Sequence, residues 1–369
     1  MKRVLAGFIM DGHSGGTDKY LLNFLENVKG EEVRIDFLTN EVDPELEQYL
    51  KERHSRIFAI SNLKHPIRQY WQVCRILDKG KYDIVYLNLS TAIDCIAAWA
   101  AKRKQIKRIL IHSHSSGNDC EGAIKRGVFD SIHYICRLFL YKTATEYYGC
   151  SKKAGVWLFP KWIVKSAGFH TIFNAVDTGR FVYRGEIRKE VRQQLGLEDA
   201  FVVGHVGNYT YQKNHYFVID IFEELHKRYP GAVLLLAGTG ERFETVKSMV
   251  EQKGLTNCVK MLGQRADVDC LMQAMDVFLL PSNFEGMPTV GVEAQCAGLP
   301  CLMSGTITKE AKITDKCRFL SLKVKPQVWA EALLAYKENN REEIAFLDSK
   351  ESYSLETLKK QQKKLISKA

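Results

Sequence analysis

The sequence lacks any apolar run close to the ~20 residues that cross a bilayer, so it predicts no transmembrane helix. A secretory signal is also not expected. The apolar run at residues 4–10 follows a basic start, but it stops at Asp11 without a small-residue cleavage site. A first β-strand is therefore the better interpretation of residues 4–10, and we expect a cytoplasmic protein.

No C-x-x-C pair occurs among the 10 cysteines, which are scattered along the chain. This spacing argues against disulfides and zinc sites, and it favours isolated thiols in a reducing compartment. We expect buried thiols at the cysteines that lie in or beside apolar segments, which are Cys150, Cys258, Cys296 and Cys301.

The sequence does contain enough apolar residues for two domains. With 369 residues, of which 46% are hydrophobic, the chain is long enough for about two globular domains, each with a core. The net charge of +10 suits an anionic partner, or it is simply a basic surface. Nucleic acid is a poor candidate because no DNA- or RNA-binding motif is present. An anionic membrane surface suits the charge better.

Short apolar runs alternate with amphipathic segments, which predicts an α/β protein with parallel, doubly wound sheets. In the first half we expect strands at 4–10, 33–38, 56–60, 83–87, 108–111 and 170–173. In the second half we expect strands at 201–207, 232–237, 259–262, 277–280 and 300–303. Helices are expected at 18–28 (Thr17 or Asp18 as N-cap), 44–51, 67–77, 92–102, 188–195, 216–228, 289–297, 308–313, 327–338 and 355–366. Along the last helix, Glu356 and Lys360 are expected to pair.

The most informative stretch is 281–304, PSNFEGMPTVGVEAQCAGLPCLMS. A strand ends at its start, a glycine loop follows, and Pro288 stands where a first helical residue is favoured. A helix start at the carboxyl end of a parallel sheet suits an anion. Glu285 and Glu293 bracket this anion site, and the helix rises roughly 7 Å between Pro288 and Glu293, which suits a nucleotide sugar. The alternative is that the two acids only complement the helix N-terminus.

The pattern PS-x-F-E-G-x-P-x(4)-E-A, followed by AGLP, resembles the donor-sugar signature of retaining glycosyltransferases of family 4, which have the two-domain GT-B fold. The resemblance implies that Glu285 holds sugar hydroxyls and that Glu293 holds the ribose hydroxyls. It also implies that the helix start stabilises the leaving diphosphate. The residues of that helix start are Gly286, Met287, Pro288 and Thr289.

The loop after the strand at 201–207 carries Lys213, whose compact charge suits a leaving diphosphate. Resembling enzymes place a lysine there and an arginine soon after the strand, both on the donor phosphates. Here Asn208 holds the arginine position, so a contact worth ~100-fold or more in rate is missing. Either a neighbouring basic residue substitutes, or the protein is slow or inactive. Arg265 lies in a loop similar to the family's base-binding loop, so we expect it beside uracil.

In the first half, His114 follows the strand at 108–111 in a polar loop, where a functional role is favoured. Family 4 enzymes often carry a histidine here that contacts the donor sugar near the reacting carbon, and His112 is the fallback. We expect the strand to send the two histidines to opposite faces, and no nearby acid or cysteine completes a metal site. Gly15 and Gly16 resemble a turn that lies under the donor diphosphate in the family; a plain tight turn is the alternative.

Residues 123–162 form a long, basic, aromatic-rich stretch that we expect to be helical. Such a stretch is typical of membrane-surface binding, but core helices with lysines that reach to water explain the same pattern. If the membrane interpretation holds, replacing Lys152, Lys153 and Lys161 by Glu weakens binding to anionic vesicles.

The resemblance also divides the chain, because an Asn-Ala-Val-Asp turn matches the family's crossing into its second domain. We expect a Rossmann-like acceptor-side domain at 1–175 and a Rossmann-like donor domain at 176–352. A C-terminal helix at 353–369 is expected to pack back on the first domain.

Together these features predict a metal-independent, retaining glycosyltransferase that needs no cofactor. Its expected partners are a nucleotide-diphosphate sugar, which we take to be UDP-linked, and a lipid-linked saccharide acceptor of capsule or exopolysaccharide synthesis. Two alternatives stay open. One is a GT-B sugar-nucleotide epimerase or hydrolase. The other is a catalytically weak nucleotide-sugar-binding partner of a glycosyltransferase complex, which Asn208 favours.

Overall fold

The structure, a computed structural model, describes residues 1–12, 15–28, 30, 32–338, 341, 346 and 348–367. The chain divides into two compact units. Unit 1 contains Met1–Ala175 and the chain from Leu355 onward, and unit 2 contains Val176–Ser354. The division after residue 175 falls where the sequence places it, and the return to unit 1 comes slightly later than residue 353.

Unit 1 is built on a parallel sheet with the strand order β3-β2-β1-β4-β5-β6-β7. The order reverses between β1 and β4, as in a doubly wound sheet. The strands are β1 (Lys2–Gly7), β2 (Val33–Thr39), β3 (Ile57–Ala59), β4 (Ile84–Leu89), β5 (Arg108–Ser113), β6 (Glu146–Gly149) and β7 (Phe169–Thr171). The helices are α1 (Gly16–Val28), α2 (Pro44–Glu52), α3 (Pro66–Gly80), η1 (Ala92–Asp94), α4 (Ile96–Arg103), α5 (Ala123–Leu140), α6 (Lys152–Leu158), α7 (Lys161–Val164) and α14 (Leu355–Ser367).

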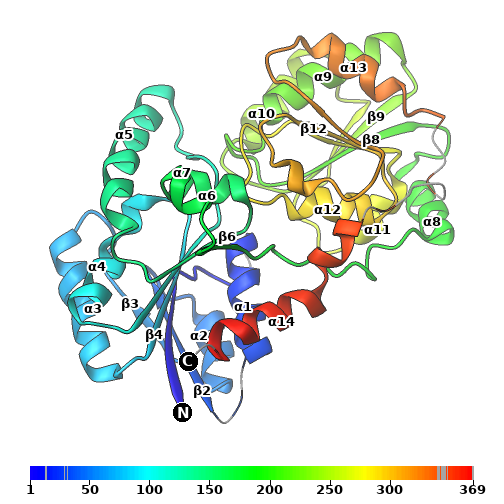
Figure 1. Cartoon of the computed structure of the whole chain (residues 1–369). Helices are drawn as coiled ribbons and strands as arrows, with labels where there is room; N and C mark the ends of the chain where they lie inside the picture. The colour runs from blue at the N-terminus through cyan, green and yellow to red at the C-terminus, as the bar shows by residue number, and fades with distance from the viewer. Residues whose placement is uncertain are drawn as a thin grey trace. The chain divides into compact units, whose positions relative to one another are not determined.

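Helices cover both faces of the unit 1 sheet, and this explains why β4 is mostly apolar and buried throughout. Figure 1 shows α14, the red helix, lying beside α1, and the two helices are in contact. The buried Gln362 fixes α14 there: its side-chain oxygen accepts from Asn27 Nδ2 at 2.8 Å, and its Nε2 donates to the Tyr20 carbonyl at 3.3 Å. The chain therefore ends by completing the core of its first unit.

Unit 2 repeats this architecture with the parallel strand order β10-β9-β8-β11-β12-β13. The strands are β8 (Phe201–Val206), β9 (Ala232–Ala237), β10 (Val259–Met261), β11 (Val277–Leu280), β12 (Cys301–Ser304) and β13 (Cys317–Leu320). The helices are α8 (Gly185–Leu195), α9 (His215–Arg228), α10 (Phe243–Gln252), α11 (Val268–Ala274), α12 (Thr289–Cys296), η2 (Lys309–Ala311), α13 (Pro326–Leu334) and η4 (Asp348–Tyr353). Figure 1 shows α9, α10 and α13 on one face of the sheet and α11 and α12 on the other.

Two expectations about local structure are wrong. Residues 123–162 are not one helical stretch, because β6 separates α5 from α6. The adjacent tyrosines of β6 suit a buried strand, but this signal is hidden in a run that is aromatic throughout. The expected helix at 308–313 is only the short 3₁₀ helix η2. The prediction of buried thiols is confirmed, because all four of the cysteines expected to be buried are buried and free.

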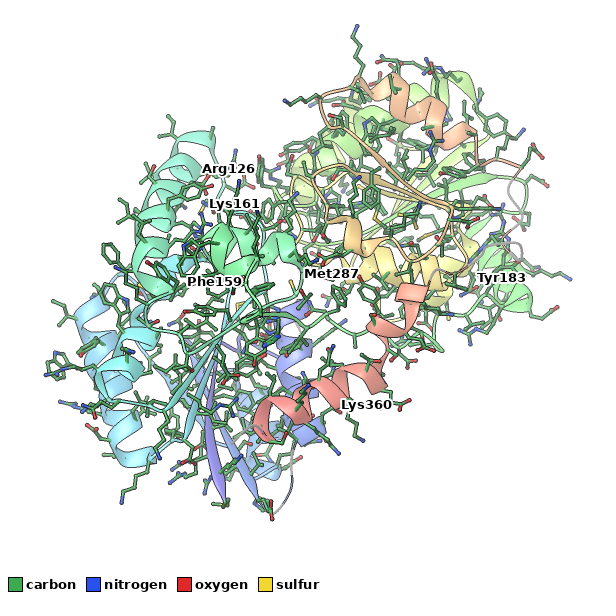
Figure 2. The ribbon with its side chains drawn as sticks, in the orientation of Figure 1. Arg126, Phe159, Lys161, Tyr183, Met287 and Lys360 are labelled. Carbon is green, nitrogen blue, oxygen red and sulfur yellow. The ribbon has the colours of Figure 1, made fainter. Side chains whose placement is uncertain are left out.

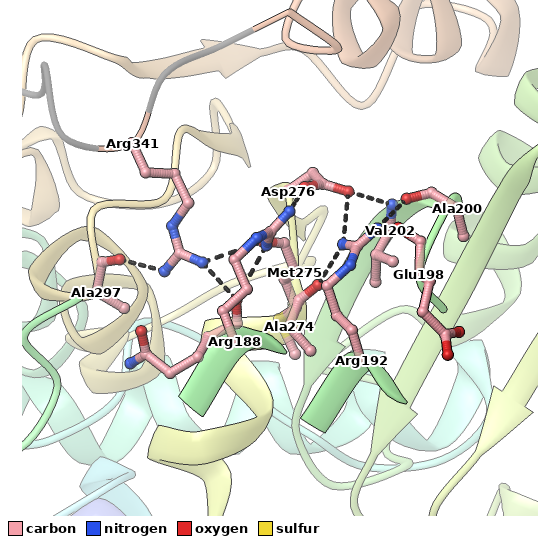
Figure 3. Close-up of polar contacts among 11 residues, drawn as sticks. Arg188, Arg192, Glu198, Ala200, Val202, Ala274, Met275, Asp276, Ala297 and Arg341 are labelled. Carbon is pink, nitrogen blue, oxygen red and sulfur yellow. Dashed lines mark hydrogen bonds and ion pairs between the residues drawn. The ribbon is translucent and has the colours of Figure 1, made fainter. Parts of the chain in front are cut away.

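A charged network holds the amino ends of the unit 2 strands (Figure 3). Asp276, just before β11, accepts hydrogen bonds from Arg188 at 2.5 Å and Arg192 at 3.3 Å, and its other contact is the backbone N–H of Val202 at 2.7 Å. Arg341 donates to the carbonyls of Gln273 and Met275 beside it, and burial lowers the pKa of Arg341 to about 9. The network joins α8, the end of α11 and the sheet.

We predict that Asp276→Asn lowers the free energy of unfolding by about 3 kcal/mol, because two arginines then lose their shared carboxylate. Urea denaturation followed by far-UV circular dichroism measures this loss. Glu356→Gln is the control. The structure confirms the predicted pair of Glu356 with Lys360, at 2.7 Å on the exposed side of α14. Figure 2 labels Lys360. Because this pair is exposed, its loss should leave the free energy of unfolding unchanged. Equal losses in both variants would contradict a stabilising role for the network.

Candidate functional site

The carboxyl ends of β8 and β11 form the switch point of the unit 2 sheet, because the two strands are neighbours and the strand order reverses between them. In open parallel sheets, ligands bind outside the carboxyl ends at this point. The loop after β8 spans residues 207–214, and the loop after β11 spans 281–288. These two loops contain most of the site residues that the sequence indicates for the second half.

Glu285 joins the two loops through its carboxylate. Lys213 donates to Oε1 at 2.8 Å, and Ser282 donates to the same oxygen at 2.8 Å. Gln212 donates to Oε2 at 2.7 Å. The Glu285 side chain is 5% exposed and that of Lys213 is 15% exposed, so this is a largely desolvated, hydrogen-bonded ion pair. The sequence indicates Lys213 and Glu285 separately, and the structure brings them together.

Sequence reasoning missed the roles of Gln212 and Ser282. Ser282 belongs to the PS-x-F-E pattern, and its spacing three residues before Glu285 was the available signal. No local pattern identifies Gln212, because its partner lies in the loop after β11, 73 residues away. Its contact exists only because β8 and β11 are neighbours in the sheet.

Hydrogen bonds to backbone carbonyls also hold the two loops together. Asn283 N donates to the Gln212 carbonyl at 2.8 Å, and Asn283 Nδ2 donates to the Tyr211 carbonyl at 2.7 Å. Asn214 Nδ2 donates to the Pro281 carbonyl at 3.0 Å in return. These bonds hold Gln212 and Asn214, the two neighbours of Lys213 in the chain, and so fix the position of Lys213.

Two glycines let Lys213 lie close to the backbone. A Cβ at Gly207 would lie 2.8 Å from Cδ and Cε of Lys213, so the lysine stem crosses a position where only glycine leaves room. Gly238 has φ +141°, and a Cβ there would lie 2.1 Å from the Gly207 carbonyl oxygen. The loop after β9 thus packs directly on the loop after β8.

The predicted helix start is present, with one correction. Pro288 is the residue before α12 rather than its first residue, and the helix begins at Thr289. Gly286 and Met287 precede it in a buried loop, and Met287 is labelled in Figure 2. The Thr289 N–H donates to the Met287 carbonyl at 3.0 Å, which tightens the turn into the helix. No side chain caps this helix start.

The remaining unit 2 candidates surround these loops. Glu293 is half-buried on α12, and its charge, after that of Asp269, helps to raise the pKa of Arg180. Arg265 forms a two-pronged ion pair with Asp267 at 2.8 and 2.7 Å. Asn208 is exposed directly after β8.

Arg242, which the sequence did not indicate, is a basic residue in contact with the loop after β8. Its N–H donates to the Tyr209 carbonyl at 3.1 Å, and its guanidinium lies 5.5 Å from the Tyr211 ring centre and 5.0 Å from that of Tyr216. Burial, with His205, Lys213 and Arg242 next to it, holds the pKa of His215 below its usual range. The charges of Lys213 and Arg242 therefore both affect His215, so two cations lie around the short segment after β8.

In unit 1, the expectation that strand geometry separates the histidines is wrong. Residues two apart lie on the same face of a strand, and the rings of His112 and His114 are 4.2 Å apart. His112 is fully buried with Nδ1 at 2.7 Å from the Tyr86 hydroxyl, which removes it as a ligand contact. His114 Nε2 lies 2.9 Å from Asn88 Oδ1, and Asn88 Nδ2 donates to the Gly7 carbonyl.

The protonation of His114 follows from these contacts. Because Asn88 Oδ1 can only accept, Nε2 of His114 carries the proton and Nδ1 is an acceptor. Burial lowers the pKa of His114 to about 3, so the ring is neutral near pH 7. Among the residues that the structure describes, Nδ1 has no hydrogen-bond partner. His114 thus has an acceptor nitrogen that is buried and has no partner among the described residues.

In the turn after β1, an internal carboxylate binds the backbone N–H groups that precede the two glycines. Asp18 is in the first turn of α1, which begins at Gly16, so neither Thr17 nor Asp18 is the N-cap. The Asp18 carboxylate accepts the N–H groups of residues 10, 11 and 12 at 2.8 to 3.2 Å. These donors are therefore already used by an internal anion. Gly15 has φ +103°, and a Cβ on Gly16 would lie 3.3 Å from Asn174 Nδ2.

A cavity of about 750 Å³ opens at the switch point of the unit 1 sheet. It is lined from the ends of β1, β2 and β4 by residues that include Asp11, Gly15, Asn40, Asn88 and Asp94. Burial raises the pKa of Asp94 to about 6. The lining is rich in hydrogen-bond acceptors, so it suits a ligand with many hydroxyl groups.

Two features concern the whole of the described chain. Within residues that the structure describes, no group of three or more His, Cys, Asp or Glu side chains is arranged to hold a metal ion. Of the described helices, none is both long and apolar enough to cross a membrane. Metal independence stays a prediction.

Two family models match the chain. The model described as Glycosyltransferase Family 4 matches residues 14–180, and the model described as Glycosyl transferases group 1 matches residues 187–351. One match therefore falls almost entirely on unit 1 and the other within unit 2. The chain is a glycosyltransferase with the GT-B fold.

Relatives of this glycosyltransferase cover nearly its whole length. EpsF of Bacillus subtilis, named as a glycosyltransferase, is 28% identical over 90% of this chain and 87% of its own. An Escherichia coli UDP-Gal:α-D-GlcNAc-diphosphoundecaprenol α-1,3-galactosyltransferase is 26% identical over 78% of this chain and 76% of its own. HepE from Anabaena, solved with UDP and glucose, has a TM-score of 0.76 and 18% identity, with 100% and 99% of the two chains covered. That structural likeness shows the predicted fold.

For this glycosyltransferase we predict that Lys213→Met destabilises unit 2 by about 3 kcal/mol, because a buried carboxylate loses its cation. Glu285→Gln in the same chain should recover much of that loss, since an amide needs no counter-charge. Urea denaturation of the two single variants and the double variant gives the coupling energy, expected to be at least about 1 kcal/mol. Strictly additive effects would mean that the two groups do not stabilise each other.

Proposed function

We propose that this protein is a retaining glycosyltransferase that moves a sugar from a UDP-linked donor to a lipid-linked saccharide in exopolysaccharide or capsule synthesis. The observation that carries the proposal is the cluster at the unit 2 switch point, where Lys213 and Gln212 from one loop bind Glu285 from the other. Opposite charges are held there in a desolvated position beside a helix start. Such a site suits a ligand with an anionic centre and hydroxyl groups at its ends.

Named relatives support the choice of donor and acceptor. HepE has been solved with UDP and with UDP-glucose. The name of the Escherichia coli relative specifies a UDP-galactose donor and an acceptor linked to diphosphoundecaprenol. EpsF and a Vi polysaccharide biosynthesis protein of Salmonella typhi, 27% identical over 39% of this chain, support a polysaccharide pathway.

In the proposed reaction, the bond between the anomeric carbon and the diphosphate oxygen breaks, and the diphosphate keeps the electron pair. The acceptor hydroxyl oxygen bonds to the same face of that carbon, and its proton passes to the departing diphosphate. Lys213 and the helix start at Gly286 and Met287 stabilise the growing negative charge. Glu285 holds the sugar hydroxyls and Glu293 the ribose hydroxyls. No cofactor or metal takes part if these groups carry the charge.

Unit 1 is proposed to serve the sugars. His114 is neutral, and the family resemblance assigns it to the donor sugar near the reacting carbon; because its acceptor nitrogen is buried, this contact requires the surrounding side chains to move. The acceptor-rich cavity at the unit 1 switch point suits the hydroxyl groups of a saccharide better than a phosphate, because Asp11 and Asp94 would repel an anion.

The arginine that is missing at position 208 has a candidate replacement in Arg242. A missing arginine on the donor phosphates would favour the catalytically weak alternative. We propose that Arg242 supplies the second cation, because its backbone is bonded to the loop after β8 and its guanidinium lies over Tyr211. Arginine suits this role because its fork can bind two phosphate oxygens.

The donor prediction concerns binding and turnover together. Calorimetry is expected to show binding of UDP and of at least one UDP-sugar to the wild-type protein. Glu285→Lys should abolish turnover of the UDP-sugar, because it removes the hydroxyl acceptor and places a cation against Lys213. Glu293→Gln should weaken UDP binding about tenfold or more, through loss of a charged hydrogen bond to the ribose. If no UDP or GDP nucleotide binds, or if Glu285→Lys keeps wild-type turnover, the proposed function is wrong.

The second-cation prediction compares three variants. Arg242→Ala is expected to lower kcat about 100-fold, whereas Arg242→Lys should restore part of it, because a charge is kept without the fork. Asn208→Arg in the wild-type background should change kcat by less than about tenfold, since the position is already compensated. A large gain from Asn208→Arg, with no loss from Arg242→Ala, would instead indicate a lapsed enzyme. Thermal unfolding of each variant excludes a folding defect.

A further inference from the structure

The Glu285 carboxylate has little capacity left for a ligand. An ionised carboxylate accepts about four hydrogen bonds. The donors Lys213, Ser282 and Gln212 already supply three of them, at 2.7 to 2.8 Å. The Glu285 side chain is also only 5% exposed. The sugar hydroxyls that the proposed function assigns to Glu285 can therefore bind only if one of these donors leaves.

Two of the three donors are held in place by the rest of unit 2. The carbonyl of the buried Ser282 accepts from the Ser304 hydroxyl at 2.6 Å and from the Thr306 hydroxyl at 2.7 Å, at the end of β12. The carbonyl of Gln212 accepts from the Asn283 N–H at 2.8 Å. Both donors are also neutral, so an anionic ligand has no charge to draw away from Glu285 at these two positions.

Lys213 is the donor that can leave. Its neighbours in the chain are fixed, but its own side chain is long and flexible and ends in a compact charge. It is the more exposed partner of the pair, at 15% against 5% for Glu285. Its stem lies against Gly207, where no side chain obstructs it. Because a diphosphate carries more negative charge than one carboxylate, it competes with Glu285 for the ammonium group.

We propose that the Lys213–Glu285 pair closes the empty donor site, and that an intact sugar nucleotide opens it by replacing both halves of the pair. Lys213 turns to the diphosphate, and the sugar hydroxyls take the place of Lys213 on Glu285. Gln212 and Ser282 keep Glu285 oriented during this exchange. The inference rests on the proposed function, which assigns these two groups of the ligand. Neither charge of the pair is left without a partner when the whole donor binds.

The same exchange distinguishes the donor from the product UDP. UDP draws Lys213 away but brings no sugar hydroxyl to Glu285. A desolvated carboxylate that loses its cation without a replacement is costly. Binding of UDP is therefore opposed by the ion pair, whereas binding of a UDP-sugar is opposed less. Once the sugar has been transferred, the return of Lys213 to Glu285 favours the release of UDP.

Calorimetry with Glu285→Gln tests the proposal. Because the amide is neutral, Lys213 is released, and UDP is expected to bind about tenfold more tightly than to the wild type. Uridine, which has no phosphate, should bind equally to both proteins. UDP-glucose and UDP-galactose should gain less than UDP, since the amide is a weaker acceptor for the sugar hydroxyls. The affinity for the UDP-sugar relative to UDP should therefore fall about tenfold or more in Glu285→Gln.

Two controls trace the gain to Lys213. Lys213→Met/Glu285→Gln should lose the tighter binding of UDP, because no ammonium group is left to release. Glu223→Gln makes the same change of charge on α9, at a carboxylate that binds Lys227 and Lys253, and it should bind UDP as the wild type does. Thermal unfolding shows that each variant is folded. If Glu285→Gln does not fold, Glu285→Ala removes the same carboxylate and is expected to give the same tightening of UDP binding.

The outcomes separate this inference from the proposed function. Equal UDP affinities for the wild type and Glu285→Gln would overturn the inference and leave the proposed function standing. A gain that the double variant keeps, or that uridine or Glu223→Gln shares, would also overturn it, because the gain would not come from Lys213. If neither the wild type nor any variant binds UDP or a UDP-sugar, the proposed function is wrong, and the inference is wrong with it.

Discussion

The unit 2 site depends on one buried carboxylate that must be neutralised. At a switch point, the connections after two neighbouring parallel strands go to opposite faces of the sheet, so other contacts must hold the two loops together. Glu285 does this, since it accepts from the loop after β8 through Gln212 and Lys213 and from its own loop through Ser282. Without these donors a desolvated charge would be costly. The site is therefore formed before any ligand arrives.

The two units use the same sheet topology with opposite electrostatics. In unit 1 the N–H groups after β1 are satisfied by the chain's own Asp18, and acids line the nearby cavity. In unit 2 the corresponding loop after β8 brings Lys213, with Arg242 beside it. One switch point thus favours hydroxyl groups, and the other favours an anion. This division of labour suits a reaction between a saccharide and a nucleotide sugar.

Close packing and ion pairs within unit 2 keep the charged residues of its site in place. Gly238 allows the loop after β9 to pack directly on the backbone at Gly207, and Gly207 allows the Lys213 stem to lie against it. At the other end of the same strands, Asp276 binds two arginines and a strand N–H. The sheet of unit 2 is thus held by close contacts at both ends of its strands.

The sequence by itself determined the alternation of strands and helices, the division after residue 175 and the acid–glycine–proline pattern around Glu285, because each of these is local. It could not determine that Lys213 binds Glu285, that Arg242 contacts the loop after β8, that Asp18 accepts the N–H groups of residues 10–12, or that His112 and His114 share a face. It also hid β6 in an aromatic-rich run. These facts were decided by the tertiary structure, because they depend on which strands become neighbours and on how closely two distant loops can approach.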